Sequence, residues 1–505
     1  NVTPSVNAGG AQNVAEGQLV TLAPATFSDP GFDCPLCDPA TAEDFTAAID
    51  WGDGTTEPAG DITLIETPGA ELVPTAGTVQ ASHHYADNGS YTVTVSVCDD
   101  DGACGNSTLT VNVGNVAPVV EAGPNQSNSE GVFLTLAPAT FSDPGFDHAP
   151  GGTNETFTAS VNWGDGTSEP AGAIALFETP GAEGQPTTGS VQAAHAFADD
   201  GSYVVTVQVC DDDGLCGSDT LTVTIANVAP TIDAGDSQTA DEGDTVSLDP
   251  ATYTDLGFDN SSAPTSETHT ATISWGDGTV DSGTVSGVPG SEGIRTTGTI
   301  DGSHVYADDG LYTVEVEVCD DNGGCSSGLL FVTVNSVTPT VEAGTNQASA
   351  EGDFISLDPA TFSDAGFDCP TCAPPTSEDF EATIDWGDGT TEPAGDITLV
   401  ETTGQPTTGS VQGAHAYADN GVYTVTVQVC DDDGYCGSDT LTVTVGNVAP
   451  TILTIGDDQE TFEGIFINLA PVTFEDPGFD NLAAPTGESF TASINWGDNT
   501  SEPLG

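Results

Sequence analysis

Apolar and polar residues alternate along several short stretches of the chain. Apolar side chains take every second position in residues 45–51, 91–97 and 109–113. This is the pattern of strands that bury one face. No segment shows the 3.6-residue period of an amphipathic helix. Short strands separated by turns rich in Gly, Pro, Asp and Asn predict an all-β fold, and in particular an antiparallel β-sandwich.

The same arrangement recurs along the chain. A Trp-Gly-Asp motif ends the strand at Trp51 and returns every 110–112 residues, at Trp163, Trp275, Trp386 and Trp496. A second motif leads through a Val-rich strand into an acidic loop, and it starts at His83, His195, His304 and His415. Such a long period indicates consecutive domains. We predict five units, the last one partial: 1–114, 115–226, 227–335, 336–446 and 447–505.

The two motifs together resemble those of the polycystic kidney disease (PKD) family of immunoglobulin-like β-sandwich modules. The resemblance rests on Trp-Gly-Asp-Gly-Thr at 51–55, followed by His83 to Tyr91 and the Val-rich strand up to Gly102, and it extends over essentially the whole chain. It implies a tandem array of PKD-type sandwiches from a bacterial or archaeal surface protein. The chain departs from the family pattern in a longer loop between the second and third strands and in an added cysteine pair.

The charge of the chain limits its partners. It has one basic residue, Arg295, against 79 Asp and Glu, so its formal net charge is −78. Nothing can neutralise phosphates, which excludes nucleic acid and anionic membrane surfaces as electrostatic partners. Cations remain natural partners, because so many carboxylates repel one another. A solubility coat or adaptation to salty water is the alternative explanation of the charge.

The twelve cysteines form six close pairs. Four have the spacing C-x5-C and two have the spacing C-x2-C: Cys98 with Cys104, Cys210 with Cys216, Cys319 with Cys325, Cys430 with Cys436, Cys34 with Cys37, and Cys369 with Cys372. Zinc needs about four ligands together, but the C-x2-C pairs lie three repeats apart, and a thioredoxin-like redox motif needs a βαβ setting. We therefore predict six local disulfides and an oxidising extracellular location. Each C-x5-C pair should close the hairpin between the last two strands of its unit.

The sequence shows no anchor of its own. No run of 18 apolar residues is present, and no signal peptide precedes the first linker, Asn1 to Pro4. We expect the chain to be part of a longer array, with export signals and anchors outside it.

Acidic loops make calcium the expected metal. Calcium prefers six to eight oxygen ligands on flexible loops. In an immunoglobulin-like sandwich, the Asp-Pro-Gly-Phe-Asp loop, the Asp-Asp-Asp-Gly loop and the entering linker should meet at one end, and the PKD resemblance places calcium there. Simple turns are the alternative. The candidate ligands are Asp29, Asp33, Asp99, Asp101, Asn115, Asp143, Asp147, Asp211, Asp213, Asp255, Asp259, Asp320, Asn322, Asp364, Asp368, Asp431 and Asp433.

Catalysis is not expected from these residues. Each motif histidine stands alone in its repeat, without a paired Ser or Cys nucleophile, so we interpret it as structural. The Tyr of the Asp-x-Gly-x-Tyr turn resembles a tyrosine corner, whose hydroxyl binds nearby backbone. Paired carboxylates are the catalytic groups of glycosidases, but here they repeat in every unit and lie in turns.

The sequence thus favours a structural segment of a secreted stalk, adhesin or filament, stiffened by calcium at domain junctions. Copies of the chain, a surface glycan or a surface protein are its candidate partners. The alternative is a set of accessory modules that bind polysaccharide or protein for a larger secreted hydrolase.

Overall fold

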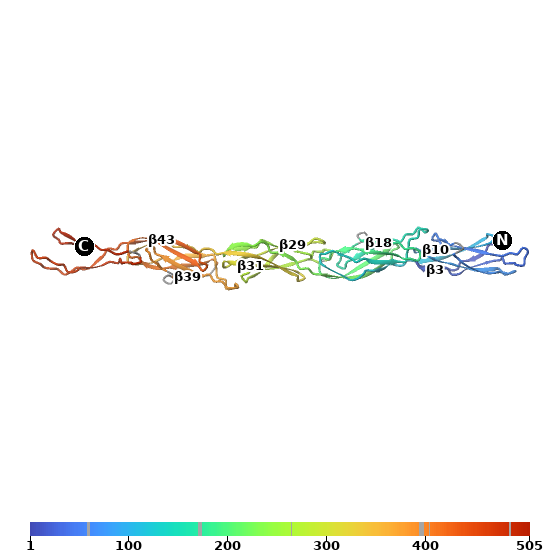
Figure 1. Cartoon of the computed structure of the whole chain (residues 1–505), viewed down its shortest axis with the longest axis horizontal. Helices are drawn as coiled ribbons and strands as arrows, with labels where there is room; N and C mark the ends of the chain where they lie inside the picture. Colours follow the sequence, from blue (N-terminus) through green and yellow to red (C-terminus); the bar gives the residue numbers. More distant parts are fainter. Residues whose placement is uncertain are drawn as a thin grey trace. The chain divides into compact units, whose positions relative to one another are not determined.

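A computed structural model describes residues 1–57, 61–169, 174–263, 265–392, 398–402, 405–483 and 486–504. Residue 505, the last of the predicted fifth unit, lies outside these ranges. Within them the chain consists of strands and connecting loops, and Figure 1 shows no helix. No described segment can therefore cross a membrane as a helix. The predicted all-β array of immunoglobulin-like sandwiches is confirmed.

The first sandwich has two main sheets, with the strand orders β1-β4-β8-β7 and β2-β11-β10-β5-β6, and a short β3-β9 ladder. Only β2 runs parallel to its neighbour, β11. These are the two sheets of an immunoglobulin-like domain. The strands are β1 (Ser5–Asn7), β2 (Gln12–Ala15), β3 (Leu19–Thr21), β4 (Ala25–Asp29), β5 (Phe45–Asp50), β6 (Thr56–Glu57), β7 (Thr63–Thr67), β8 (Thr75–Gln80), β9 (Ser82–His84), β10 (Gly89–Asp99) and β11 (Cys104–Gly114).

The second and fourth sandwiches repeat this order. The second has β12 (Val119–Glu121), β13 (Gln126–Ser129), β14 (Leu134–Thr135), β15 (Ala139–Asp143), β16 (Phe157–Asn162), β17 (Ser168–Glu169), β18 (Ala175–Thr179), β19 (Thr187–Gln192), β20 (Ala194–His195), β21 (Gly201–Asp211) and β22 (Cys216–Ala226). The fourth has β33 (Thr340–Glu342), β34 (Gln347–Ala350), β35 (Phe354–Ser356), β36 (Ala360–Asp364), β37 (Phe380–Asp385), β38 (Thr391–Glu392), β39 (Thr398–Thr402), β40 (Thr407–Gln412), β41 (Ala414–Ala416), β42 (Gly421–Asp431) and β43 (Cys436–Gly446).

The third sandwich differs at one side. Its long strand β28 joins the two sheets into one of eight strands, ordered β23-β26-β29-β28-β27-β31-β32-β24. Its strands are β23 (Thr231–Asp233), β24 (Gln238–Asp241), β25 (Thr245–Ser247), β26 (Ala251–Asp255), β27 (His269–Ser274), β28 (Val280–Val288), β29 (Thr296–Asp301), β30 (Ser303–Val305), β31 (Gly310–Asp320) and β32 (Cys325–Asn335). The region after the fourth sandwich has two hairpins, made by β44 (Thr451–Thr454), β45 (Thr473–Glu475), β46 (Ala492–Asn495) and β47 (Ser501–Leu504).

The alternating pattern forms the core of each sandwich. In β5, Phe45, Ala47 and Ile49 are buried while the residues between them are exposed, and Trp51 at the strand end has no exposed surface. The hydroxyl of Tyr85 donates to the Trp51 carbonyl at 3.0 Å, so the buried phenol is satisfied. Equivalent core clusters occupy the other three sandwiches.

The last two long strands of each sandwich are tied at one end by a disulfide. Cys98 and Cys104 face each other at the end of the β10–β11 ladder and are bonded. The same bond closes the equivalent hairpin in the other three sandwiches, where it joins Cys210 to Cys216, Cys319 to Cys325, and Cys430 to Cys436. The predicted hairpin disulfides are therefore confirmed.

The two C-x2-C pairs each close a turn within a loop. Cys34 and Cys37 are bonded in the loop between β4 and β5, where Cys37 is exposed and its amide donates to the Cys34 carbonyl at 3.2 Å. Cys369 and Cys372 form the equivalent bond in the fourth sandwich, but there Cys372 is buried. All twelve cysteines thus pair as predicted, and none is free to bind zinc.

The predicted tyrosine corner is confirmed as well. The Tyr91 hydroxyl donates to the Asp87 carbonyl at 2.9 Å, four residues upstream. The equivalent tyrosines of the other sandwiches, Tyr203, Tyr312 and Tyr423, make the same hydrogen bond to Asp199, Asp308 and Asp419.

The chain divides into two compact units. The first contains Asn1–Ala229, Asp255–Thr268 and Val288–Thr297; the second contains Pro230–Thr254, His269–Gly287 and Gly298–Gly505. The first unit therefore holds two sandwiches and two segments of the third, residues 255–268 and 288–297, while the second unit holds the rest.

Candidate metal centre

The acidic loops of the second sandwich each present a carboxylate oxygen that has no partner. Asp143 ends β15, and its Oδ1 accepts a hydrogen bond from the Gly145 amide at 2.8 Å. Asp211 ends β21, and its Oδ1 accepts one from the Leu215 amide at 2.9 Å. The Oδ2 atoms of both residues are buried without a hydrogen-bond partner. Such oxygens are costly to bury alone, so they are suited to bind a cation.

The first sandwich places two more carboxylates against these loops. Glu16, in the turn between β2 and β3, is 3% exposed, and its Oε1 accepts from the linker amide of Val116 at 2.6 Å. Asp87 lies between β9 and β10. Carboxylate oxygens of Glu16, Asp87 and Asp213 all lie within 4.8 Å of one another. The acidic loops of the second sandwich thus meet the linker and the far end of the first sandwich.

Backbone contacts hold this arrangement in place. The amide of Phe146 donates to the carbonyl of Ala86 at 3.2 Å, next to Asp87. Gly17 has a φ of +62°, and a Cβ at this position would lie 2.2 Å from the carbonyl oxygen of Pro144. Only glycine allows both the left-handed conformation and this close approach. The Glu-Gly pair therefore positions its carboxylate by letting the next sandwich come close.

Burial, together with the crowding of like charges, raises the pKa values in this cluster. Burial, followed by the charges of Asp143, Asp211 and Asp87, raises the pKa of Glu16 to about 7, although the Val116 amide opposes the shift. Burial and the Asp211 charge raise the pKa of Asp143 to about 6. Burial, with Asp212 and Asp143 nearby, raises the pKa of Glu155 to about 9. At neutral pH these carboxylates therefore need either protons or a cation.

We define the first junction cluster as Glu16, Asp87, Asn115, Asp143, Glu155, Asp211 and Asp213. A second junction cluster occurs in the other unit, between the third and fourth sandwiches: Glu242, Asp308, Asp364, Glu378, Asp431 and Asp433. Oxygens of Glu242, Asp308 and Asp433 again lie within 4.8 Å of one another.

The second junction cluster repeats the geometry of the first. The linker amide of Val337 donates to Glu242 Oε1 at 2.5 Å, and Glu242 Oε2 is buried without a hydrogen-bond partner. The Oδ2 atoms of Asp364 and Asp431 are buried without one as well. Burial and the Asp364 charge raise the pKa of Glu378 to about 9. Each of the two compact units thus contains a junction at which buried carboxylates gather.

The predicted ligands have different positions. The aspartates that begin and end the Asp-Pro-Gly-Phe-Asp loop accept hydrogen bonds from different amides. Asp147 Oδ1 accepts from the Glu155 amide at 3.0 Å, and Asp33, Asp259 and Asp368 bind the matching glutamate amide. Their visible role is to hold the loop end that carries this glutamate. Asp29 and Asp99 each have a buried Oδ2 without a hydrogen-bond partner, and Asp99 Oδ1 lies 3.1 Å from Asn1 Nδ2. The side-chain nitrogen of Asn115 is buried without a partner.

The remaining predicted ligands belong to neither junction cluster. Asp101 lies in the exposed part of its loop and contributes to raising the pKa of Glu43, whose main cause is burial. In the third sandwich, Asp255 Oδ1 accepts from the Gly257 amide in the first unit. Asp320 Oδ1 accepts from the Gly324 amide in the second unit, in the loop that also contains Asn322.

Sequence reasoning missed three members of each cluster. Glu16 and Glu242, each followed by a glycine, are buried at the junctions but were not among the predicted ligands. Asp87 and Asp308 follow the buried tyrosine of the second motif, and Glu155 and Glu378 end the variable loop. The signal for the first two was their recurrence at fixed positions in each repeat.

The donor set of the clusters fits a hard cation. The side chains that converge offer carboxylate oxygens, and neither cluster as defined contains a Cys or a His. Calcium takes such ligands, whereas zinc and copper favour nitrogen and sulfur. Calcium would lie among Glu16, Asp87, Asp143, Asp211 and Asp213 in the first cluster, and among the matching residues in the second.

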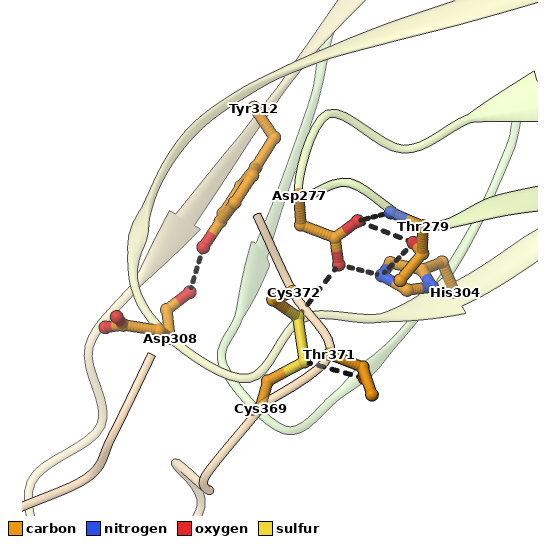
Figure 2. The surroundings of a disulfide bond; sticks show 8 residues. All are labelled: Asp277, Thr279, His304, Asp308, Tyr312, Cys369, Thr371 and Cys372. Atoms are coloured by element: carbon orange, nitrogen blue, oxygen red, sulfur yellow. Dashed lines mark hydrogen bonds and ion pairs between the residues drawn. A yellow bond between two sulfur atoms is a disulfide. The ribbon is translucent and has the colours of Figure 1, made fainter. Parts of the chain in front are cut away.

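A separate Asp–His pair lies at the same end of the sandwich as Asp87. His83 Nε2 lies 2.6 Å from Asp53 Oδ2, and its ring stacks on Trp51. The same pair is formed by Asp165 and His195, by Asp277 and His304, and by Asp388 and His415. Figure 2 shows the third pair, with Thr279 on the other oxygen of Asp277. Stacking and pairing give these histidines a structural role.

A scan against protein-family models finds no match, and no curated protein matches the chain. Solved structures with similarity include the protocadherin gammaB4 extracellular domain, at 12% identity and a TM-score of 0.26, covering 97% of this chain and 75% of that one. Drosophila N-cadherin EC1-4 has 16% identity and a TM-score of 0.21, covering 87% and 99%. The human desmocollin-1 ectodomain has 12% identity and a TM-score of 0.22, covering 88% and 79%. These values are too low to assign the chain to a family.

Proposed function

We propose that the chain is an extracellular structural segment whose neighbouring sandwiches are locked together by calcium. The observation that carries this proposal is the pair of junction clusters, in which buried oxygens such as Asp143 Oδ2 and Asp364 Oδ2 lack partners beside other carboxylates. Like charges pressed together repel, and a divalent cation turns this repulsion into a bridge.

Several features support a mechanical rather than a catalytic role. The local disulfides suit an oxidising extracellular space. The same acidic junction is built twice, which suits a repeated structural joint. The PKD-like motifs support modules of a secreted stalk, adhesin or filament from a bacterial or archaeal surface. Copies of the chain and surface glycans or proteins are the proposed partners.

Calorimetry of the full chain tests calcium binding. Unfolding is recorded with calcium, with chelator, and with sodium chloride matched for ionic strength. Specific binding predicts that calcium raises the melting temperature well beyond the salt control. At a hundredfold excess over the dissociation constant, one bound ion stabilises by about 2.7 kcal/mol. Equal effects of calcium and matched salt would mean that the carboxylates need only screening, and the proposal would be wrong.

A further inference from the structure

The Asp–His pairs of three sandwiches also contact the sandwich that follows. In the first unit, His148 Nε2 lies 3.9 Å from Asp53 Oδ2. In the second unit, the amide of Ala373 donates to the Asp277 carbonyl at 2.6 Å, and Cys372 Sγ lies 3.8 Å from Asp277 Oδ2 (Figure 2). The group that the following sandwich contributes differs from one junction to the next, while the Asp–His pair that it contacts is the same.

The pair of the second sandwich has the most specific partner. His195 Nε2 lies 2.7 Å from Asp165 Oδ2, and its Nδ1 lies 3.3 Å from Oε1 of Glu292. The same Oε1 accepts a hydrogen bond from the Ala196 amide at 3.2 Å. Glu292 lies in the hairpin tip between β28 and β29, which the Ser291–Ile294 bridge closes. The tip of the third sandwich thus reaches the histidine of the second, and all these residues belong to the first unit.

The two carboxylates around the ring favour the form of His195 that carries a proton on each nitrogen. An ionised carboxylate only accepts hydrogen bonds, so a nitrogen that faces one must carry a hydrogen. His195 faces carboxylates with both nitrogens, and only the imidazolium form has two N–H groups. The other close groups are the Thr167 hydroxyl, at 3.3 Å from Nε2, and the rings of Trp163 and Phe197. Asp165 and Glu292 are the ionisable groups that the described contacts place on this ring.

The titration of Asp165 agrees with such a charge. Burial alone would raise the pKa of Asp165. Hydrogen bonds from His195 and Thr167 outweigh burial, so that the pKa lies below its usual value. Asp165 is therefore ionised beside His195 at neutral pH.

We propose that the Trp-stacked Asp–His pair is a docking site for the following sandwich, and that Glu292 docks on it only while His195 carries a proton. When His195 loses this proton, its positive charge is lost and the Glu292 contact weakens.

Hydrogen exchange on the full chain tests this docking site. The Ala196 amide, which donates to Glu292, and the peptide 288–297 report on the contact. Exchange is measured with chelator present at pH 5.5 and 8.5, and it is corrected for the intrinsic pH dependence of exchange. We expect protection in the wild type to fall about three- to fivefold at the higher pH, the size of a partly exposed ion pair. Glu292→Gln should remove this pH dependence.

A matched control distinguishes docking from a general effect of charge. Glu183 occupies the equivalent tip of the second sandwich, between β18 and β19, so Glu183→Gln removes the same charge without touching His195. It should leave Ala196 unchanged. Glu292 is 45% exposed, so its amide variant should fold.

Nitrogen-15 spectra of labelled histidine give a second readout, since His195 should show two protonated nitrogens at pH 6. Equal protection of Ala196 in wild type and Glu292→Gln at both pH values, or a single protonated nitrogen at pH 6, would overturn the proposal. Because chelator is present throughout, failure here leaves the calcium proposal untouched.

Discussion

The acidic loops of the first and second sandwiches have nearly the same sequence but different surroundings. In the first sandwich, Glu43 has a raised pKa, with burial as the main cause. In the second, burial raises the pKa of the equivalent Glu155 to about 9, and the charges of Asp212 and Asp143, then those of Glu16 and Asp87, add to the shift. The loops of both sandwiches bury aspartate oxygens that have no partner, so the packing of one sandwich on the next adds the carboxylates of Glu16 and Asp87 to them.

The largest expected effect is a loss of calcium stabilisation when the loops of the second sandwich, but not those of the first, are changed. Asp143→Asn with Asp211→Asn removes both orphaned oxygens of the first junction cluster. This double variant should lose the share of calcium stabilisation that comes from that junction, about 2.7 kcal/mol at a hundredfold excess of calcium. The matched variant, Asp29→Asn with Asp99→Asn, should retain it. Calorimetry with calcium and with chelator measures both, and equal losses would show that packing adds nothing to the site.

Removal of a hairpin disulfide should have the next largest effect. Cys98→Ser with Cys104→Ser should destabilise the first sandwich by about 2 kcal/mol, because a short closed loop is released in the unfolded chain. The calcium effect should persist, since these cysteines belong to neither junction cluster. Chemical denaturation with calcium present and absent checks this. Loss of the calcium response would show that the disulfide affects the junction clusters, which would contradict this expectation.

A glycine substitution tests the close approach of two sandwiches. Gly17→Ala places a Cβ 2.2 Å from the Pro144 carbonyl oxygen, whereas nothing lies within 4 Å of a Cβ at Gly464, which has a similar positive φ. Both variants should lose about 1 kcal/mol to backbone strain, and only Gly17→Ala should also weaken calcium binding. Titration calorimetry of the two variants provides the comparison. Equal calcium affinities would mean that the approach is not needed.

A further expected effect is a pH dependence of the chelated protein. The pKa of Glu16 rises from 4.5 to about 7 in the folded chain, and that of Glu155 from 4.5 to about 9. A carboxyl group whose pKa is raised by folding costs no stability at low pH, where it is protonated in both the folded and the unfolded chain. Stability is lost as pH rises from the unfolded to the folded pKa. With chelator, the melting temperature should therefore fall between about pH 4.5 and 9, and calcium should reduce the fall. A flat profile would contradict the crowding of charges.

Much of the fold followed from the sequence. The alternation from Phe45 to Trp51 and along residues 91–97 marked strands that the structure contains, and the spacing of Cys98 and Cys104 marked their hairpin. These features are local, because side-chain alternation and short loops depend on neighbouring residues. The eight-stranded sheet of the third sandwich was not predicted, because it depends on how the long strand β28 pairs on both sides.

The site was only half predictable. Asp143 and Asp211 stood out because acidic loops are visible in a single repeat. Glu16 and Asp87 belong to a different sandwich, and only the packing of one repeat on the next brings them to these loops. Asp147 was expected to bind metal, and one of its two oxygens accepts a hydrogen bond from the Glu155 amide. Sequence identifies charged residues, but it does not show which of their oxygens are already used by backbone.

Anomalous diffraction from crystals of the full chain grown with calcium would locate the bound ions. Calcium at the junctions should give a peak within bonding distance of carboxylate oxygens from both neighbouring sandwiches, with Glu16 and Asp143 among the ligands at the first junction. Calcium confined to the exposed loops, or junctions without a peak at saturating calcium, would contradict the proposal.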